Sequence, residues 1–389
     1  MTKSTETRDR ERLRVAHVCH TVAEGGAEIG LARLIENRPS WVPFLFVPKG
    51  SERDKILTRA PFAAISYLGP LQKPGLTQAR LGGALRFLSS IARHTLALCA
   101  NSEFRAAHLV NANSSRAAVY ATVASRVVRK PLVVHLHDAI SIESLGKLGH
   151  LIMARFVLPS ARGVIANSTY TLQTASEHVR NGAVCRVIPT PVGVSRRTIP
   201  AVERDEIVRV GMVARITEWK GQALVLEAFS RAFRDSNVRL QFVGGTELGG
   251  EDYLQVLHER ALELGISDRV DFLGQVPTVQ VEDLIDSFDI CIQASIRPEP
   301  LGQNVLQYLA RARPTIVTAA GGPQEWIADG VNGRLFGLGS VDELAQRLDE
   351  LKPKSEREAL CLGAIETSLP TLTALIEMHQ ELYTACVRA

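Results

Sequence analysis

Two cations of this 389-residue chain stand in a spacing that suits a diphosphate. Arg215 follows an apolar run, and Lys220 comes directly before Gly221 and a helical pattern. Fixed cations beside a helix N-terminus can bind a diphosphate, because a guanidinium donates to two oxygens at once. Two solvated loop cations are an equally good interpretation of the spacing alone.

A carboxylate stands on a second candidate turn, Arg-Pro-Glu-Pro-Leu-Gly, in which Glu299 lies between two prolines. The prolines and the glycine predict a rigid turn, followed by a helix. Glu299 on this turn can accept hydrogen bonds from sugar hydroxyls, and the free N–H groups of the next four residues can face a negative ligand. Those four residues are Leu301, Gly302, Gln303 and Asn304. The alternative is a Glu299 that only forms a structural ion pair.

Two histidines stand where a strand prediction ends, in the sequence Val-Val-His-Leu-His-Asp. Alternation along a strand places His135 and His137 on the same side. An imidazole titrates near neutral pH, so either histidine can transfer a hydroxyl proton or bind a sugar. A purely structural role is the alternative for both.

Gly25 and Gly26 follow the first apolar run and precede a helical pattern. Such a turn lets the backbone approach a phosphate or a sugar, and the helix N-terminus presents free N–H groups to it. A tight turn alone also explains two glycines. The G-x-G-x-x-G pattern is missing, which argues against a dinucleotide-dependent dehydrogenase. The sequence Gly-Gly-Pro-Gln-Glu at 321–325 is a further backbone-rich turn.

These residues are positioned by apolar runs that alternate with helical patterns along the whole chain, which is typical of parallel sheets covered on both faces. Strands are predicted at 15–20, 43–47, 64–68, 108–111, 132–136, 163–166, 185–188, 208–214, 239–243, 270–273, 290–293 and 315–318. Helices are predicted at 27–37, 76–100, 114–128, 169–179, 221–234, 253–264, 279–287 and 303–311. Ser340 and Glu343 fit a capping box that opens another helix.

The predicted fold class is α/β, with two Rossmann-like, doubly wound domains that face each other across a cleft. Residues 189–206 contain three prolines and little periodicity, so they are interpreted as a linker. The predicted domains are residues 1–195 and 196–370, and a final helical segment, 371–389, is expected to pack back toward the first domain. Ligands of such folds bind at the carboxyl ends of the strands.

Composition favours a globular, cytoplasmic enzyme, with 46% hydrophobic and 22% charged residues. The charged start is unlike a secretory signal, no apolar run is long enough to span a membrane, and neither CxxC nor HExxH occurs. Residues 1–195 contain 25 Lys and Arg against 12 Asp and Glu, whereas residues 196–389 contain 20 against 29. The basic first part favours an acidic acceptor or a membrane surface over a plain solvated face. The predicted helix 76–100, with Arg80, Arg86 and Arg93 among leucines, can rest on an anionic membrane, but packing against its own sheet is the favoured interpretation of it.

Taken in order, these motifs resemble the GT-B family of retaining glycosyltransferases, often called family 4. The resemblance rests on Gly-Gly-Ala-Glu, His-Leu-His-Asp, Arg…Lys-Gly, Val-Asp-Phe-Leu-Gly, Glu-Pro-Leu-Gly and Gly-Gly-x-x-Glu, and it covers nearly the whole chain. It implies that the C-terminal domain binds a nucleotide sugar and that the N-terminal domain binds the acceptor. It also implies retention of the sugar's configuration and no metal ion or other cofactor.

The resemblance assigns roles to individual residues. The donor phosphates are assigned to Gly25, Gly26, Arg215, Lys220, Leu301 and Gly302. The sugar and the nucleotide are assigned to Glu299, Gln303, Asn304, Gln307, Gly274 and Val276, and the reacting centre to His137, Glu299, Arg215 and Lys220. His137 rather than His135 matches the family's histidine.

One position departs from the family pattern, which pairs two glutamates eight positions apart. Gln307 stands where the second glutamate is expected. An amide still accepts and donates hydrogen bonds, so binding of ribose hydroxyls can survive without the charge. The substitution also leaves open a changed nucleotide preference or weaker donor binding.

The expected activity is transfer of a hexose-type sugar to a hydroxyl in envelope polysaccharide, lipopolysaccharide or glycolipid synthesis. The expected partners are a nucleotide sugar, an acidic or lipid-linked glycan and the inner face of the membrane, and no nucleic acid. A sugar-nucleotide epimerase and a non-catalytic binding protein of the same fold are the alternatives. Neither the nucleotide nor the acceptor follows from the sequence.

Overall fold

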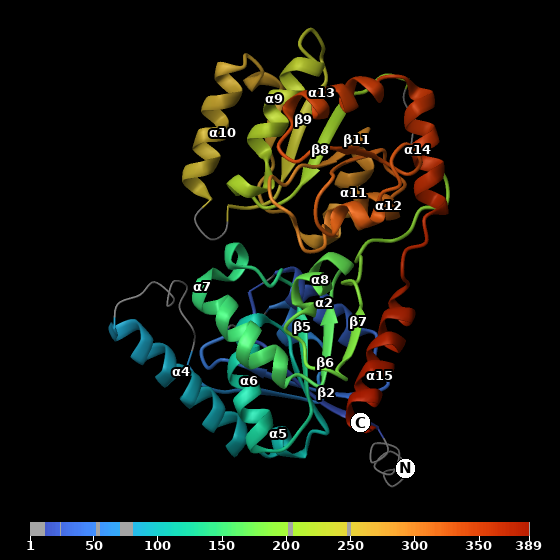
Figure 1. Cartoon of the computed structure of the whole chain (residues 1–389). Helices are drawn as coiled ribbons and strands as arrows, with labels where there is room; N and C mark the ends of the chain where they lie inside the picture. Colours follow the sequence, from blue (N-terminus) through green and yellow to red (C-terminus); the bar gives the residue numbers. More distant parts are fainter. Residues whose placement is uncertain are drawn as a thin grey trace. The chain divides into compact units, whose positions relative to one another are not determined.

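The computed structural model describes residues 12–23, 25–51, 55–70, 81–200, 205–246 and 250–388, without the side chains of 81–86 and 278. Residues 76–80 of one predicted helix, with Arg80, and the side chain of Arg86 therefore lie outside the description. The chain forms two units (Figure 1). Unit 1 consists of Met1–Pro191 and Pro370–Ala389, and unit 2 consists of Val192–Leu369.

Unit 1 is built on a seven-stranded parallel sheet with the order β3-β2-β1-β4-β5-β6-β7. Its strands are β1 (Arg14–Val18), β2 (Val42–Val47), β3 (Ala64–Tyr67), β4 (Leu109–Ala112), β5 (Leu132–Leu136), β6 (Gly163–Ala166) and β7 (Val184–Val187). Its helices are α2 (Gly26–Glu36), α3 (Ile56–Arg59), α4 (Leu81–Ala100), α5 (Ser102–Ala106), α6 (Ser115–Val127), α7 (Ile142–Ile152), α8 (Thr169–Ser176) and α15 (Leu372–Arg388). A π-helical segment, Met153–Val157, and a 3₁₀ turn, Leu158–Ser160, follow α7.

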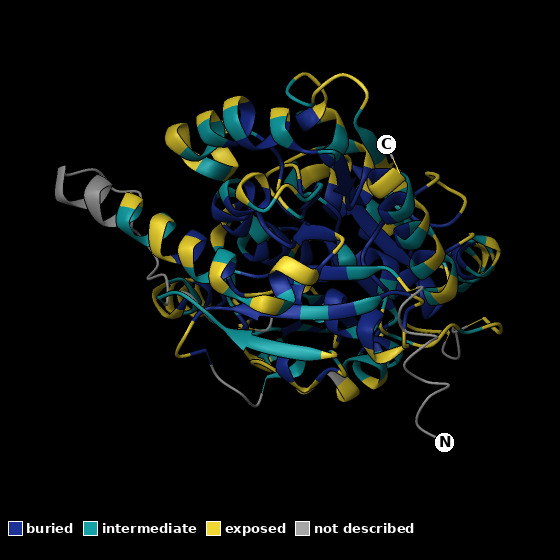
Figure 2. Cartoon of the chain, turned by 90° about the horizontal axis from the view of Figure 1, so that it is seen from below, coloured by how far each residue is buried: buried dark blue, intermediate teal, exposed yellow. Residues whose placement is uncertain are grey.

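The two faces of this sheet bury alternate residues of the same strand. Val134 of β5 packs in a cluster with α4 and α6, whereas Val133 packs with α2 and α15. All residues of β4, β5 and β6 are buried, as expected for central parallel strands covered on both faces, and the edge strand β3 is half-buried. Figure 2 shows this contrast between dark, buried strands and exposed outer faces of helices.

The last helix, α15, belongs to unit 1 and packs on β4 to β7 and on α2. Gly163 of β6 makes this packing close, because a Cβ there would collide with Cys386 of α15. The boundary between the units, after Pro191, lies four residues before the predicted one. Val192 and Val194 pack into a core of unit 2, and Ser195 donates to Glu282, which accounts for the difference.

Unit 2 is built on a six-stranded parallel sheet with the order β10-β9-β8-β11-β12-β13. Its strands are β8 (Arg209–Val213), β9 (Arg239–Val243), β10 (Val270–Phe272), β11 (Ile290–Gln293), β12 (Thr315–Thr318) and β13 (Arg334–Phe336). Its helices are α9 (Gln222–Ala232), α10 (Glu251–Glu263), α11 (Thr278–Ser287), α12 (Gln303–Ala310), α13 (Val341–Glu350) and α14 (Lys354–Glu366), with short 3₁₀ turns at Glu218–Lys220, Ser267–Arg269 and Pro323–Trp326.

The predicted strands at 132–136, 163–166, 239–243, 290–293 and 315–318 are confirmed residue by residue. Ser340 caps α13 by accepting from the Glu343 N–H, as predicted. Neither β13 nor α7 is predicted from the sequence. Among the described residues, no helix is long and apolar enough to cross a membrane.

Candidate functional sites of the two units

Each sheet has one pair of neighbouring strands whose connections leave in opposite directions. In unit 2 the pair is β8 and β11, because β8 leads to β9 on one side and β11 leads to β12 on the other. In unit 1 the pair is β1 and β4, which lead to β2 and β5. Open α/β sheets bind ligands outside the carboxyl ends of such pairs. The predicted site residues are therefore expected near the ends of these two strand pairs.

In unit 2 the segments that follow β8 and β11 are joined by their backbones. The N–H of Ile296 donates to the carbonyl of Trp219 at 2.9 Å. Gly221 has a φ of 82°, and a Cβ there would collide with the carbonyl oxygen of Ala294. Only glycine fits a left-handed position this close to another backbone. Gly221 thus brings Lys220 next to the chain that leaves β11.

Lys220 and Glu299 form a buried ion pair at this place. The other carboxylate oxygen of Glu299 accepts from Gln293 at 2.9 Å and from Ser295 at 2.8 Å. Burial alone would raise the pKa of Glu299, but the charge of Lys220 and the three donors outweigh it and lower the pKa of this carboxyl. Glu299 is therefore ionised at neutral pH and is oriented by three side chains.

The predicted Gly-Gly turn supports the Glu299 backbone. The N–H of Gly322 donates to the carbonyl of Glu299 at 2.8 Å, and Gly321 pairs with Glu299 in a short parallel bridge. A Cβ at Gly321, where φ is 69°, would collide with the same carbonyl. The chain after β12 thus helps to hold Glu299 at the end of β11.

The two predicted phosphate-binding cations differ in the structure. The Arg215 side chain is exposed, and within the described residues it has no hydrogen bond or ion pair. The Lys220 ammonium is bonded to Glu299 and lies 4.3 Å from the centre of the Trp219 ring. An ammonium has three donors, so bonding to Glu299 leaves two for a ligand.

The helix that follows Glu299 begins as predicted. Gly302 has a φ of 71°, and Leu301 is buried in a core of unit 2. The Asn304 amide donates to the carbonyl of Val213 at 3.1 Å and its oxygen accepts from Val305, so this side chain fastens α12 to the end of β8. Gln303 is half-buried in the first turn.

Gly274 and Val276 follow β10, which is an edge strand of the unit 2 sheet. The carbonyl of Gly274 accepts from the N–H of Gly244, the residue that follows β9. Gly274 is exposed with a φ of 66°, whereas Val276 packs on a small apolar cluster with Val243. The structure therefore places this segment beside β9, one strand away from β8.

Gln307 uses its amide inside unit 2. Its Nε2 donates to the carbonyl of Val192 at 3.2 Å. A glutamate at 307 has no donor for this carbonyl at neutral pH. The departure from the family pattern therefore has a structural consequence: α12 is bonded to the segment that leads into unit 2, and the amide oxygen stays available to a ligand.

In unit 1 the predicted glycines and histidines lie at the ends of β1 and β5. Gly25 and Gly26 are exposed at the start of α2, and the N–H of Gly25 donates to Ala23. The rings of His135 and His137 are 4.1 Å apart, which confirms that they share one side of the strand.

Asn113, which has no predicted role, connects these features. Its Oδ1 accepts from His137 Nε2 at 3.3 Å, and its Nδ2 donates to the carbonyl of Ala27 at 3.3 Å. Asn113 directly follows β4, so it links the ends of β4, β5 and α2. A polar residue after a buried strand was the available signal in the sequence.

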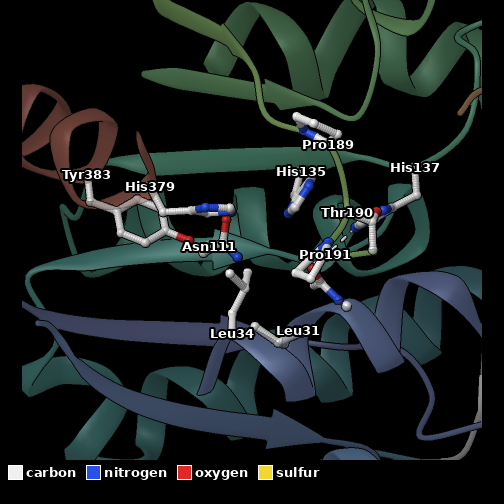
Figure 3. A pocket seen from close by; sticks show the side chains of 12 residues that line it. Leu31, Leu34, Asn111, His135, His137, Pro189, Thr190, Pro191, His379 and Tyr383 are labelled. Carbon is white, nitrogen blue, oxygen red and sulfur yellow. Dashed lines mark hydrogen bonds between the residues drawn. The ribbon is translucent and has the colours of Figure 1, made fainter. Parts of the chain in front are cut away.

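A small pocket of unit 1, lined by apolar and polar side chains, lies beside this group (Figure 3). Its lining includes Asn111, His135 and His137 from the sheet, Thr190 from the segment that leaves unit 1, and His379 from α15. His379 donates from Nδ1 to the carbonyl of Leu375, so its Nε2 carries a lone pair. Within the described part of the chain, the Nε2 atoms of His135 and His379 are buried without a hydrogen-bond partner.

The histidines around this pocket are neutral at pH 7. Burial, followed by the charge of His379, lowers the pKa of His17 to about 3 and that of His137 to about 4. Burial lowers the pKa of His379 to about 4 against its bond to Leu375. The indole of Trp41 donates to His17 Nε2 at 3.1 Å, which requires an unprotonated nitrogen there. His137 is thus a neutral hydrogen-bonding group and not an acid.

Across the described ranges, no three His, Cys, Asp or Glu side chains are grouped in a way that suits a metal ion. The six cysteines are free thiols scattered over both units.

Part of unit 2 is similar to a family of known proteins. Residues 198–361 match the family model described as glycosyl transferases group 1. The lipopolysaccharide core biosynthesis glycosyltransferase LpsE of Rhizobium meliloti is 28% identical over 172 residues, 43% of this chain and 47% of that protein. A D-inositol 3-phosphate glycosyltransferase of Stackebrandtia nassauensis is 30% identical over 169 residues, 42% and 38%. The match thus spans less than half the length of these curated relatives.

Solved structures match over nearly the whole chain. HepE of Anabaena, in complex with UDP and glucose, has a TM-score of 0.77 at 22% identity and covers 95% of this chain and 99% of its own. Sucrose-phosphate synthase from Thermosynechococcus elongatus has a TM-score of 0.75 at 19% identity, with 96% and 98% covered. These likenesses show the fold, which is the two-unit GT-B type that the sequence predicts.

Replacing Lys220 with methionine is expected to destabilise unit 2 by about 3–5 kcal/mol, because Glu299 would stay buried without its cation. The surface pair of Lys354 and Asp205 provides the control, and Lys354→Met should cost about 0–1 kcal/mol. Urea unfolding followed by tryptophan fluorescence measures both. The additional change Glu299→Gln should recover much of the loss, and equal effects of the two lysine variants would contradict a buried pair.

Gln307→Glu is expected to lower the free energy of unfolding of unit 2 by roughly 1–3 kcal/mol, since the Val192 carbonyl loses its donor and faces a carboxylate. Gln324→Glu, at an exposed position of the same unit, is the matched control. Thermal unfolding without ligand at pH 8 reports the difference. A Gln307→Glu protein as stable as the control would mean that the bond to Val192 contributes nothing.

The stability of unit 1 is expected to fall as the pH drops from about 6.5 to about 4. In this range the histidines bind protons in the unfolded chain, but the same histidines stay unprotonated where they are buried in the folded protein. His379→Gln should flatten this dependence, whereas His258→Gln, at an exposed position of unit 2, should leave it unchanged. Melting temperatures measured from pH 7.5 to 4.5 test the idea. A wild-type protein with no loss of stability over this range would show that these imidazoles are already solvated.

Proposed function

We propose, on the premise that residues 198–361 belong to the glycosyl transferases group 1 family, that this chain is a glycosyltransferase with a nucleotide-sugar donor. One observation carries the proposal: an ionised, buried Glu299 is paired with Lys220 where the strand order of unit 2 diverges. A family match alone gives no site, and the geometry alone gives no reaction. Their agreement supports transfer of a sugar to a hydroxyl.

Arg215 and Lys220 are proposed to bind the donor diphosphate. Arg215 is exposed and unbonded within the described chain, so it can meet a ligand without breaking a contact. Lys220 can share its ammonium between Glu299 and a phosphate oxygen. As the glycosidic bond breaks, negative charge grows on the phosphate, and fixed cations stabilise it. The proposed reaction therefore needs no metal ion or other cofactor.

Glu299 is proposed to accept hydrogen bonds from hydroxyls of the transferred sugar, because its carboxylate is held ionised by three donors. Leu301, Gly302 and Gln303 would present backbone N–H groups to the donor, and Asn304 would keep their helix in place. Gly274 and Val276 would flank the nucleotide, and Gln307 would bond a ribose hydroxyl through its amide oxygen. The structure of HepE in complex with UDP-glucose makes UDP-glucose the first nucleotide sugar to test.

Unit 1 is proposed to bind the acceptor. His137, held neutral beside Asn113, would bond a hydroxyl near the reacting carbon, and Gly25 and Gly26 would bring backbone close to the donor phosphates. Retention of configuration and a hexose as the transferred sugar are proposed from the family resemblance. An epimerase with this fold would bind the same donor but would need no acceptor.

The acceptor is proposed to be an acidic or lipid-linked glycan of the cell envelope. The basic balance of residues 1–195 supports this, and so does the likeness to LpsE, which is named for lipopolysaccharide core synthesis. Helix α4 exposes Leu88 and Leu96 around Arg93, a face that suits peripheral contact with an anionic membrane. Nucleic acid is not proposed as a partner, and the proposed place is the cytoplasm, on the inner face of the membrane.

Titration with UDP, GDP, ADP, CDP and TDP in a chelating buffer tests the donor site. One nucleotide should raise the melting temperature, since binding to the folded state alone stabilises it. Arg215→Ala should weaken that nucleotide roughly tenfold or more without lowering stability, as expected for a lost bond to a charged group. Arg231→Ala, in an exposed ion pair of the same unit, should bind normally.

Arg215 is chosen because substitution of Lys220 would also destabilise the protein. No stabilisation by any nucleotide would favour a binding protein without transferase activity. If the nucleotide stabilises the Arg215→Ala protein as much as the wild type, Arg215 does not bind the donor.

A further inference from the structure

Unit 1 contains a buried carboxyl group that no proposed role above uses. Glu28 is the third residue of α2, yet only 5% of its surface is exposed. Its Oε2 lies 2.9 Å from the place where a Cβ of residue 25 would stand, so the carboxyl rests against the Gly25 backbone. Among the described residues, no Lys or Arg forms an ion pair with it.

Capping of α2 does not explain this burial. A glutamate in the first turn of a helix interacts with the helix dipole from solvent, where it loses no hydration. In a capping box Glu28 would accept from the N–H of Gly25, but that N–H donates to Ala23 instead. Within the part of the chain that the structure describes, the carboxyl accepts a hydrogen bond from its own backbone N–H alone. A buried carboxyl with so few donors is costly, so the position calls for another explanation.

The groups that face Glu28 increase this cost. Asp138 follows β5 and Cys19 follows β1, and both interact electrostatically with Glu28. Burial, only partly offset by the bond to its own N–H, and then the charge of Asp138 raise the pKa of Glu28 to about 7. The carboxyl therefore exchanges its proton at the pH at which enzymes work.

The surroundings indicate which ligand suits this place. Glu28 lies at the pair β1 and β4, the ligand-binding edge of the unit 1 sheet. Asn113, which contacts Cys19, Ala27 and His137, lies at the same edge. At the Glu28 side chain two neighbouring carboxyls disfavour a phosphate or carboxylate, whereas a hydroxyl can donate to one of them. The phosphate contact proposed for Gly25 and Gly26 is with their backbone, at the exposed N-terminus of α2. The ligand group expected here is an uncharged hydroxyl.

We propose that Glu28 binds the hydroxyl that receives the sugar and orients it through a hydrogen bond to its carboxylate. The inference rests on the proposed transferase function and names the acceptor-binding group of unit 1. The ionised form accepts from the hydroxyl, so transfer should be lost as the pH falls below about 7. Any acidic group of the acceptor must bind away from Glu28 and Asp138.

Stability gives a test that needs no ligand. When the pKa of a carboxyl is higher in the folded than in the unfolded protein, the protein loses stability as the pH rises. For Glu28 this loss should occur from about pH 4.5 through pH 7. Glu28→Gln removes this loss, so its melting temperature relative to the wild type should be higher at pH 8 than at pH 5. Glu36→Gln, at the exposed end of the same helix, should show no such change.

Turnover gives the second test. UDP-glucose, or the glucose derivative of whichever nucleotide binds, is the donor, with water and methyl glucosides as hydroxyl acceptors. Release of the nucleotide should increase through pH 7 in the wild type. Glu28→Gln should reduce it roughly ten- to hundredfold at pH 8 and flatten the profile, as expected for one lost bond to a charged group. Affinity for the nucleotide alone should not change.

The outcomes separate this inference from the proposed function. A wild type that binds no nucleotide and turns over no donor removes the function and this inference with it. A wild type that turns over the donor, with Glu28→Gln equally active at every pH, removes the inference alone. A variant that loses both stability at pH 8 and turnover would show that Glu28 is structural.

Discussion

The buried ion pair between Lys220 and Glu299 is the interaction on which the rest of unit 2 depends. Two charges can be withdrawn from water only where their partners are already in position. Gly221 provides this by its contact with Ala294, and Gly321 and Gly322 provide it from the chain after β12. Three separate segments, after β8, β11 and β12, therefore converge on Glu299, and the strand order that brings β8 beside β11 makes the convergence possible.

The same topological reason places the polar groups of unit 1. A parallel strand must return through a helix on one face, so two neighbours that send their helices in opposite directions leave a crevice between them. In unit 1 this crevice lies between β1 and β4, where Gly25, Glu28 and Asn113 meet. The sheets differ in sequence and in number of strands. The two sites are comparable because each lies beside the pair of strands whose connections leave in opposite directions, and not because their residues are similar.

The central strands could be predicted because a strand that is buried on both faces has a nearly continuous apolar sequence, as β5, β11 and β12 do. The edge strand β13 has three residues beginning with Arg334, and α7 contains Gly146 with a φ of 70°, so both lack that signal. Glu299 and Lys220 could be predicted individually. Their bonding to each other could not, because a contact across 79 positions is set by tertiary structure. For the same reason the sequence does not predict the hydrogen bond from the Gln307 side-chain amide to Val192, or the hydrogen bonds by which Asn113 joins His137 to Ala27.

Two buried carboxyls of this chain show how surroundings can divide chemical roles. Both lose hydration, but Glu299 gains a cation and two neutral donors, whereas Glu28 gains another carboxyl as its neighbour. The first is therefore ionised at every physiological pH and suits an invariant ligand contact. The second has a pKa of about 7 and can change its charge as a ligand arrives. A cation beside Glu28 would hold it ionised, as Lys220 does for Glu299, and would remove this change of charge.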